Sequence, residues 1–309
     1  MTTTTGTARV RDVTLRDGLQ LTGGLMPTDE KVRLVRELLD LGISDIEIGS
    51  MARPDLVPPM ANTLEVVEAL EPDELARCWV WVATPRGVER AASAGVTRMQ
   101  YCLSVSDAHN RANIGRSTED SMAALPRALD IAGEAGAELQ LCLATSFTCP
   151  FDGAVDPERT LALVRDPRAE RCSDTVICDT LGQADPAQVA YLVGETARIR
   201  PEHEVVFHGH DTWGMGVANA LAAVGAGATV LDGALGGLGG CPFAPGAAGN
   251  TSTEDLLFAL KPAGMTPERF ATFVRLGERV TSSLGEESTS RAAKGARSTA
   301  RAFDWVIAD

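Results

Sequence analysis

The feature that most constrains the fold is a regular alternation of two patterns along the chain. Short apolar runs rich in β-branched residues predict strands, and a stretch with helical periodicity follows each of them. The expected strands cover residues 9–14, 43–49, 78–83, 97–104, 138–145, 174–179, 204–210 and 228–232. The expected helices cover residues 28–41, 58–70, 85–94, 118–135, 156–165, 185–199, 212–225 and 251–261. In a chain of 309 residues, this repeated strand–helix unit predicts an α/β fold, the (β/α)8 or TIM barrel.

A doubly wound open sheet is the alternative fold for such an alternation. It is less favoured, because no glycine-rich phosphate loop follows the first strand. We expect residues 1–8 to form a flexible tail and residues 9–265 to form the barrel domain. Residues 266–309 exceed the barrel pattern, and we expect them to form additional C-terminal helices that pack on it.

Composition excludes several classes of partner. The net charge of −14 argues against a surface for polyanions, and no basic run is interleaved with aromatics, so we expect no nucleic-acid partner. No apolar stretch has the length of a membrane span, and the first residues lack the apolar core of a signal peptide. Seven cysteines, scattered mostly among apolar strands, are typical of reduced, buried thiols. These features predict a cytoplasmic protein without membrane contact.

Two histidines at the end of one expected strand suggest a metal site. In the segment FHGH, His208 and His210 occupy alternate positions, so they project to the same side of a strand. This spacing suits two ligands of one metal ion. From the pair alone, hydrogen-bonded histidines beside a turn are an equally good interpretation.

Other polar residues also follow the expected strands, where a TIM barrel collects its chemistry. Strand 43–49 is expected to point Glu47 along an inner face otherwise occupied by Ile. A charged side chain inside a barrel is costly unless it is paired or bound to metal. The further polar residues at strand ends include Arg16, Asp17, Gln20, Ser50, Ser106, Asp179 and Thr180.

The loop after the last expected strand, GALGGLGGCPFAPGAAGN, holds seven glycines. Ordering such a segment costs much backbone entropy, so we expect it where the chain must move or closely approach a ligand. It contributes Cys241 and Asn250 to the mouth of the barrel. The simpler interpretation of Cys241 is a small apolar loop residue.

Taken together, the motifs resemble those of the 3-hydroxy-3-methylglutaryl-CoA lyase family, within the DRE-TIM metallolyases. The resemblance rests on TLRDGLQ, EIGS with PxxVPxM, CPFDG, CDTLG, HGHDTWG and GLGGCPFAPGAAGNTSTEDL, in the family's order from about residue 9 to the end. The leading RDG alone is shared with isopropylmalate and homocitrate synthases and with carboxyltransferase domains. Those synthases usually carry an acidic residue at the position of Leu19, which favours the lyases.

The resemblance implies a set of site residues. The metal, Mg²⁺ or Mn²⁺, would be bound by Asp17, His208, His210 and Asn250. A carboxylate, imidazole and amide set suits these ions in octahedral geometry. The catalytic residues would be Arg16, Asp17, Glu47, Asp179, His208 and Cys241. The substrate would contact Gln20, Ser50, Ser106, Asn113 and Thr180.

The activity implied is cleavage of 3-hydroxy-3-methylglutaryl-CoA, or a close 3-hydroxyacyl-CoA analogue, to acetyl-CoA and a keto acid by a homodimeric enzyme. Departures from the family pattern limit the substrate assignment. Residues 21–24 replace Asn, Glu and Lys, Gly209 replaces a Cys, and Asp55 with Leu56 replaces a Lys-Trp pair. Fewer basic residues near the mouth predict altered contacts to the CoA phosphates, and a longer 3-alkyl group or citramalyl-CoA is a plausible substrate.

Two other functions fit the same sequence. One is a Claisen-type synthase of the same superfamily that condenses acetyl-CoA with an oxo acid, although about 45 residues after the barrel are few for its usual regulatory domain. The other is a barrel that holds a metal without catalysis.

Overall fold

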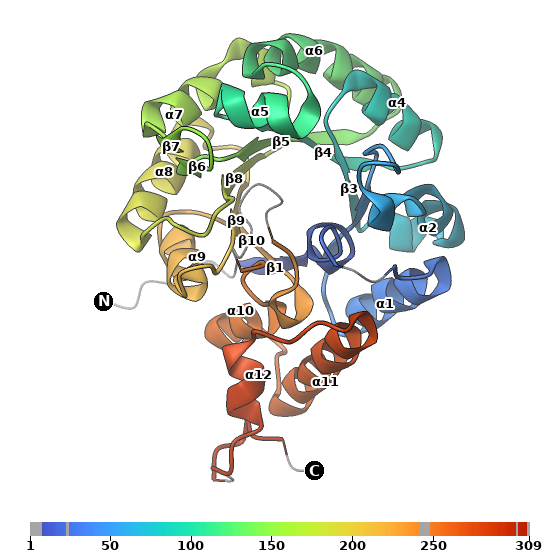
Figure 1. Cartoon of the computed structure of the whole chain (residues 1–309), viewed down its shortest axis with the longest axis vertical. Helices are drawn as coiled ribbons and strands as arrows, with labels where there is room; N and C mark the ends of the chain where they lie inside the picture. The colour runs from blue at the N-terminus through green and yellow to red at the C-terminus, as the bar shows by residue number, and fades with distance from the viewer. Residues whose placement is uncertain (1–7, 23–24, 241–247, 301, 308–309) are drawn as a thin grey trace.

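A computed structural model describes residues 8–22, 25–240, 248–300 and 302–307. Eight parallel strands close into a barrel in the order β1-β10-β9-β8-β5-β4-β3-β2, seen in Figure 1 with helices around it. The strands are β1 Arg9–Asp12, β2 Asp45–Ser50, β3 Cys78–Val82, β4 Arg98–Ser104, β5 Glu138–Ala144, β8 Thr175–Asp179, β9 Val205–Gly209 and β10 Val230–Gly233. All eight coincide with expected strands, so the TIM-barrel prediction is confirmed and the open sheet is excluded.

A helix follows each barrel strand. These are α1 Thr28–Asp40, α2 Thr63–Ala69, α4 Pro85–Ser93, α6 Thr118–Glu134, α7 Pro157–Arg165, α8 Pro186–Ile199, α9 Gly216–Gly225 and α10 Thr253–Leu260. The expected helix 58–70 is interrupted, because a 3-10 turn at Pro58–Met60 precedes α2. Elements that the sequence pattern did not predict are short: α3 Pro72–Leu75, α5 Asp107–Ile114, the 3-10 turn Pro167–Ala169 and the hairpin β6 Thr148–Cys149 with β7 Gly153–Ala154.

Strand alternation divides the apolar and polar residues of β2 between two environments. Ile46 and Ile48 belong to the main hydrophobic core, together with Leu38 of α1. Asp45 and Glu47 point to the other side, into the barrel, since successive side chains of a strand face opposite ways. The expectation that Glu47 lies on the inner face is therefore right, but the isoleucines do not share that face.

The C-terminal helices α11 Pro267–Leu284 and α12 Arg291–Ala296 lie beside α10 and outside the ring of barrel helices (Figure 1). Phe273 of α11 is fully buried in the main core. A smaller aromatic cluster joins Phe270 to Phe258 of α10 and to Trp305. Among the described residues, no helix combines the length and apolarity needed to span a membrane.

Candidate active site

Arg16 and Asp17 lie on a single π-helical turn, Thr14–Gly18, directly after β1. Such turns are rare and are frequent at functional sites, because their wide ring places side chains where an α-helix would not. All five residues of the turn are buried. The Arg16 Nη1 donates to Asp17 Oδ1 at 2.8 Å, so the turn brings a buried guanidinium against a buried carboxylate at the mouth of the barrel.

His208 of β9 and His210, the residue after its end, point toward that carboxylate, as their alternate spacing predicted. His208 Nε2 lies 3.6 Å and His210 Nε2 lies 3.3 Å from Asp17 Oδ2. The two imidazole rings are 5.3 Å apart between centroids. Among the described residues, Asp17, His208 and His210 form a group of buried side chains close enough to share one metal ion.

The hydrogen-bond partners of the two imidazoles orient both Nε2 atoms toward Asp17. Asp232 Oδ2 lies 3.0 Å from His208 Nδ1, and the ionised carboxylate can only accept, so the proton sits on Nδ1. His210 Nδ1 faces the carbonyl oxygen of Ala248 at 3.4 Å. With Nδ1 protonated, a neutral ring directs its Nε2 lone pair toward Asp17, at the place where a proton or a metal ion would hold the imidazoles and the carboxylate together.

Asn250 completes the cluster and contains an orphaned polar atom. Its Nδ2 donates to Asp17 Oδ2 at 2.9 Å, while its Oδ1 is buried and has no partner in the described part of the chain. Buried polar atoms are nearly always paired, so a buried, unpaired amide oxygen on a side chain that contacts Asp17 is consistent with a role in binding a cation. The donor set, with a carboxylate, two imidazoles and a nearby amide oxygen, fits a divalent metal ion.

The pKa values of the cluster show the same demand for positive charge. Although burial opposes the charged form, the Asp17 and Asp232 carboxylates raise the pKa of His208 to about 9. Burial also opposes ionisation of Asp17, yet Arg16 and the imidazoles hold the pKa of that carboxyl well below its usual value. The carboxylate is thus ready to bind a cation at neutral pH.

Arg16 has a second buried partner, Glu47 of β2. Its Nε donates to Glu47 Oε2 at 2.5 Å, and Glu47 Oε1 accepts from Gln100 Nε2 at 3.1 Å. Burial raises the pKa of Glu47, and the Arg16 charge partly offsets this effect. Two carboxylates therefore fix the guanidinium, while its Nη2 makes no hydrogen bond within the described residues and Arg16 lines the cavity.

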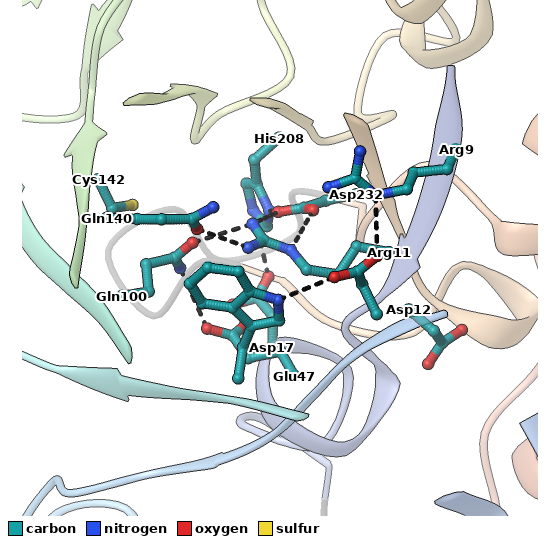
Figure 2. A network of polar contacts seen from close by, with 12 residues as sticks. Arg9, Arg11, Asp12, Asp17, Glu47, Gln100, Gln140, Cys142, His208 and Asp232 are labelled. Carbon is teal, nitrogen blue, oxygen red and sulfur yellow. Dashed lines mark hydrogen bonds and ion pairs between the residues drawn. The ribbon is translucent and has the colours of Figure 1, made fainter. Parts of the chain in front are cut away.

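A polar layer below this site joins its two halves (Figure 2). Arg11 of β1 forms a bidentate pair with Asp232, at 2.7 and 2.8 Å, and also donates to the side-chain oxygens of Gln140 and Gln100. Asp232 is also hydrogen-bonded to His208. Gln100 donates to Glu47, which in turn accepts from Arg16. This layer was not predicted from the sequence. Its signal was available, because polar residues at alternate positions of apolar strands must point into a barrel.

A cavity of about 760 Å³ opens above the cluster, a size usual for ligand sites. Of the residues expected at the site, those lining it are Arg16, Asp17, Gln20, Ser50, Asn113, Thr180, His208 and His210. Glu47 and Asn250 lie behind these residues, in contact with Arg16 and Asp17. Cys241 lies outside the described residues.

Ser106 and Asp179 do not line the cavity. The Ser106 hydroxyl accepts from the backbone N–H of His109 at the start of α5 and donates to Asp152 Oδ2 at 2.6 Å. Asp179 accepts from the backbone N–H groups of Gln183 and Ala184, both at 3.1 Å, in the loop after β8. Both side chains hold loops at the mouth of the barrel rather than open into it.

The rim of the cavity is more basic than the sequence motifs indicated. Arg53, Arg86, Arg90 and Arg111 all line it, although the motif positions near residues 21–24 and 55–56 lack basic residues. Arg53 and Arg111 pair with nearby aspartates, while Arg86 and Arg90 have no carboxylate partner among the described residues. The motif positions thus lack basic residues, as the sequence indicated, but α4 and α5 bring arginines to the cavity from outside the motifs.

The described glycines of the Gly-rich loop have a packing reason. Gly236 and Gly237 have φ of 62° and 72°, where residues with a Cβ are strained. A Cβ at Gly239 would lie 2.5 Å from Asn250 Nδ2, and one at Gly249 would lie 2.2 Å from the carbonyl oxygen of Gly237. These glycines let the backbone close tightly around Asn250. Some of the glycines in this loop are therefore required by the close packing around the candidate metal ligand Asn250.

A barrel with a buried carboxylate–imidazole cluster and a fixed arginine at its mouth defines a class of metal-site TIM barrels. Comparison with known proteins narrows this class. Residues 8–278 match the family model described as HMGL-like, so the chain belongs to that family.

Individual relatives agree with this assignment. The chain is 35% identical to the hydroxymethylglutaryl-CoA lyase of Pseudomonas mevalonii over 92% of this chain and 95% of that protein. It is 37% identical to the (R)-citramalyl-CoA lyase of Chloroflexus aurantiacus over 82% of this chain and 83% of that protein. An HMG-CoA lyase structure from Acinetobacter baumannii, in complex with coenzyme A and 3-methylmalate, superposes with a TM-score of 0.87. The two sequences are 32% identical, and the match covers 97% of this chain and 98% of that one.

Proposed function

We propose that this protein is a divalent-metal-dependent carbon–carbon lyase that cleaves a 3-hydroxyacyl-CoA to acetyl-CoA and a keto acid. 3-Hydroxy-3-methylglutaryl-CoA and citramalyl-CoA are the first substrates to test, since relatives with these activities match most of the chain. The observation that carries the proposal is the convergence of Asp17, His208 and His210 within reach of one metal ion, with Asn250 in contact with Asp17.

Asp17, His208, His210 and Asn250 would hold the metal, for which Mg²⁺ or Mn²⁺ suits the oxygen and imidazole donors. When bound, such an ion lowers the pKa of a coordinated hydroxyl and polarises a coordinated carboxylate. The neighbouring Asp232 keeps the His208 proton on Nδ1, which leaves Nε2 directed at the cluster. Loss of this contact would let the ring turn away from its ligand position.

Arg16 is suited to stabilise the thioester oxygen as the bond to be cleaved breaks. The acetyl-CoA fragment leaves with its charge on that oxygen, and preorganised donors in a water-poor site stabilise such a charge strongly. Glu47 and Asp17 fix the Nε and Nη1 edges of the guanidinium at 2.5 and 2.8 Å. A planar, always protonated group held in this way needs no reorganisation during the reaction.

Cys241 is the proposed acid that returns a proton to the departing carbon. Cys241 itself lies outside the described residues, and the support for this role is its place in the family motif and the position of the preceding residue, Gly240, in the lining of the cavity. Replacement by Ser keeps the size of the group but raises its pKa by several units, so proton delivery should slow while metal affinity stays unchanged.

The arginine rim is suited to the phosphates of coenzyme A. Guanidinium groups bind phosphate oxygens through paired, charge-assisted hydrogen bonds. Arg86 and Arg90 stand one helical turn apart on α4 and line the same cavity that contains the cluster. Double replacement by Ala should raise KM for the acyl-CoA while kcat remains close to the unmodified value, since these residues lie far from the bond that breaks.

The test is to incubate the protein with 3-hydroxy-3-methylglutaryl-CoA and citramalyl-CoA and to measure acetyl-CoA. Activity should disappear on exhaustive chelation and return with Mg²⁺ or Mn²⁺. Release of free CoA from acetyl-CoA and an oxo acid would instead identify a synthase. Metal binding without turnover of any acyl-CoA would identify a non-catalytic barrel. Homodimerisation and a cytoplasmic location belong to the same proposal, and light scattering of the purified protein tests the first.

A further inference from the structure

One wall of the cavity is built from a row of three thiols. Cys102 of β4, Cys142 of β5 and Cys178 of β8 lie on three consecutive strands around the barrel and all line the cavity. Cys102 and Cys142 are register partners, and the sulfur atoms of Cys142 and Cys178 are 3.5 Å apart. The row is therefore continuous across a large part of the inner surface.

This wall is apolar beyond the thiols themselves. Trp81 and Ala144 line the same cavity, and together with buried valines they form an apolar cluster that is separate from the main core. Contact between the thiols, followed by burial, raises the pKa of Cys102 well above its usual value, so the wall stays uncharged at neutral pH.

The wall starts beside the metal cluster. Cys178 is the register partner of His208, so the thiol row runs away from the cluster along the neighbouring strands. Gln100, two residues before Cys102 on β4, also lines the cavity, as do Arg16, Gln20 and Ser50, and these polar groups can receive the oxygen atoms of an acyl-CoA. A substrate carbon held at the cluster therefore has a polar side, and an apolar side that faces sulfur and carbon.

We propose that the thiol wall of Cys102, Cys142 and Cys178, with Trp81 and Ala144, receives the alkyl substituent on C3 of the substrate and admits groups longer than methyl. The inference rests on the proposed lyase activity and deepens it. Small side chains leave space, and apolar surface gains free energy for each methylene that leaves water. The preferred substrates are thus 3-hydroxy-3-alkylacyl-CoAs with a short unbranched or branched chain.

The experiment measures kcat/KM for 3-hydroxy-3-alkylglutaryl-CoAs with methyl, ethyl, propyl and butyl substituents. In the unmodified enzyme, kcat/KM should rise about fourfold for each methylene until the space is filled. Cys142→Leu fills the middle of the wall, so the ratio of butyl to methyl kcat/KM should fall at least about tenfold. Cys142→Ala enlarges the space, so kcat/KM should continue to rise for a substituent about one methylene longer than in the unmodified enzyme.

The matched controls are Cys172→Leu and Cys172→Ala. Cys172 is also a buried cysteine but belongs to the main core and does not line the cavity. These variants should leave the butyl-to-methyl ratio unchanged, whatever they do to stability. If Cys142→Leu does not fold, the chain-length dependence of kcat/KM in Cys142→Ala tests the proposal on its own.

The possible failures are distinct. An enzyme that cleaves the methyl substrate but shows equal kcat/KM for all chain lengths overturns the thiol-wall proposal and leaves the lyase activity intact. The same holds if the Cys142 variants keep the unmodified ratio. If no member of the series yields acetyl-CoA in the presence of metal, the lyase proposal fails, and the thiol-wall proposal fails with it.

Discussion

The two ends of the barrel are both rich in charge, yet they differ in how that charge is satisfied. At the end where the strands begin, Asp45 accepts hydrogen bonds from Arg9, Arg98, Ser44 and Trp79, at 2.8 to 3.2 Å. At the mouth, Asp17 Oδ2 lies 3.6 and 3.3 Å from the Nε2 atoms of His208 and His210, and Asn250 Oδ1 has no partner in the described chain. The density of charged residues therefore does not identify the functional end, whereas the convergence of these possible metal ligands does.

Energetics explain why one sequence keeps both arrangements. The network at the strand starts closes the barrel, because donors surround each buried carboxylate and little desolvation cost remains. The cluster at the mouth brings a carboxylate and two imidazoles together, and a positive charge, from a proton or a bound cation, stabilises this arrangement. The Arg11–Asp232 pair lies between the two ends and has features of both, since it is fully satisfied and also contacts His208.

The largest expected effect is at the cluster itself. Asp17→Asn keeps the size of the side chain but removes the charge shared by the two imidazoles and Arg16. We expect metal affinity and kcat to fall by more than the about 100-fold that outer-shell changes cost. Calorimetric titration with Mn²⁺ and acetyl-CoA release measure the two effects. If this variant kept the activity and the metal affinity of the unmodified protein, the cluster at the mouth would be a structural network like the one around Asp45.

The second effect concerns the guanidinium. Arg16→Lys keeps the charge but loses the planar fork that Glu47 and Asp17 hold. We expect kcat to fall about 100- to 1,000-fold, as for the loss of one donor to a developing oxyanion, while KM changes little. Steady-state kinetics separate the two parameters. A variant with unmodified kcat would remove Arg16 from the chemistry.

A third prediction tests the layer between the two ends. Asp232→Asn can still accept one hydrogen bond from Arg11, but it no longer fixes His208 as a carboxylate does. We expect metal affinity to fall about 10- to 100-fold. Measurement of Mn²⁺ affinity on the folded variant, monitored by circular dichroism, distinguishes this role from a loss of fold. An unchanged Mn²⁺ affinity would show that Asp232 has only a structural role, like the network at the strand starts.

Features of the fold and the site that depend on local sequence patterns could be predicted, whereas contacts between residues far apart in the chain could not. The barrel strands and the pairing of His208 with His210 follow from local periodicity, so they could be predicted. Arg11 and Asp232 are 221 residues apart in the chain, and nothing local announces that β1 and β10 are neighbours. Their contact depends on closure of the barrel.

The arginines that line the cavity could not be predicted from the local motifs either. The motif positions 21–24 and 55–56 suggested a mouth poor in basic residues. Arg86 and Arg111 lie on α4 and on α5, and α5 had no clear helical pattern in the sequence. Ser106 was expected at the substrate because it follows a strand, but its hydroxyl is used by the start of α5. Position along a strand predicts which end a residue occupies, but it does not predict which partners its side chain finds.

The smallest expected effect is at the strand-start network and provides the control for all the others. Asp45→Asn weakens the ion pairs with Arg9 and Arg98, so the free energy of unfolding should fall by about 1.5 to 3 kcal/mol while kcat stays unchanged. Although burial opposes ionisation, Arg9 is the strongest of several groups that lower the pKa of Asp45 in the folded protein. A carboxyl with a lowered pKa stabilises the fold above its unfolded pKa of about 3.9, and that stability is lost as the pH falls through the folded value. The difference between the unmodified protein and Asp45→Asn, measured by denaturant unfolding, should therefore be constant from pH 8 to about pH 5. It should shrink at lower pH, and a difference that grew toward acid, or a fall in kcat, would show that the two ends are not separate in function.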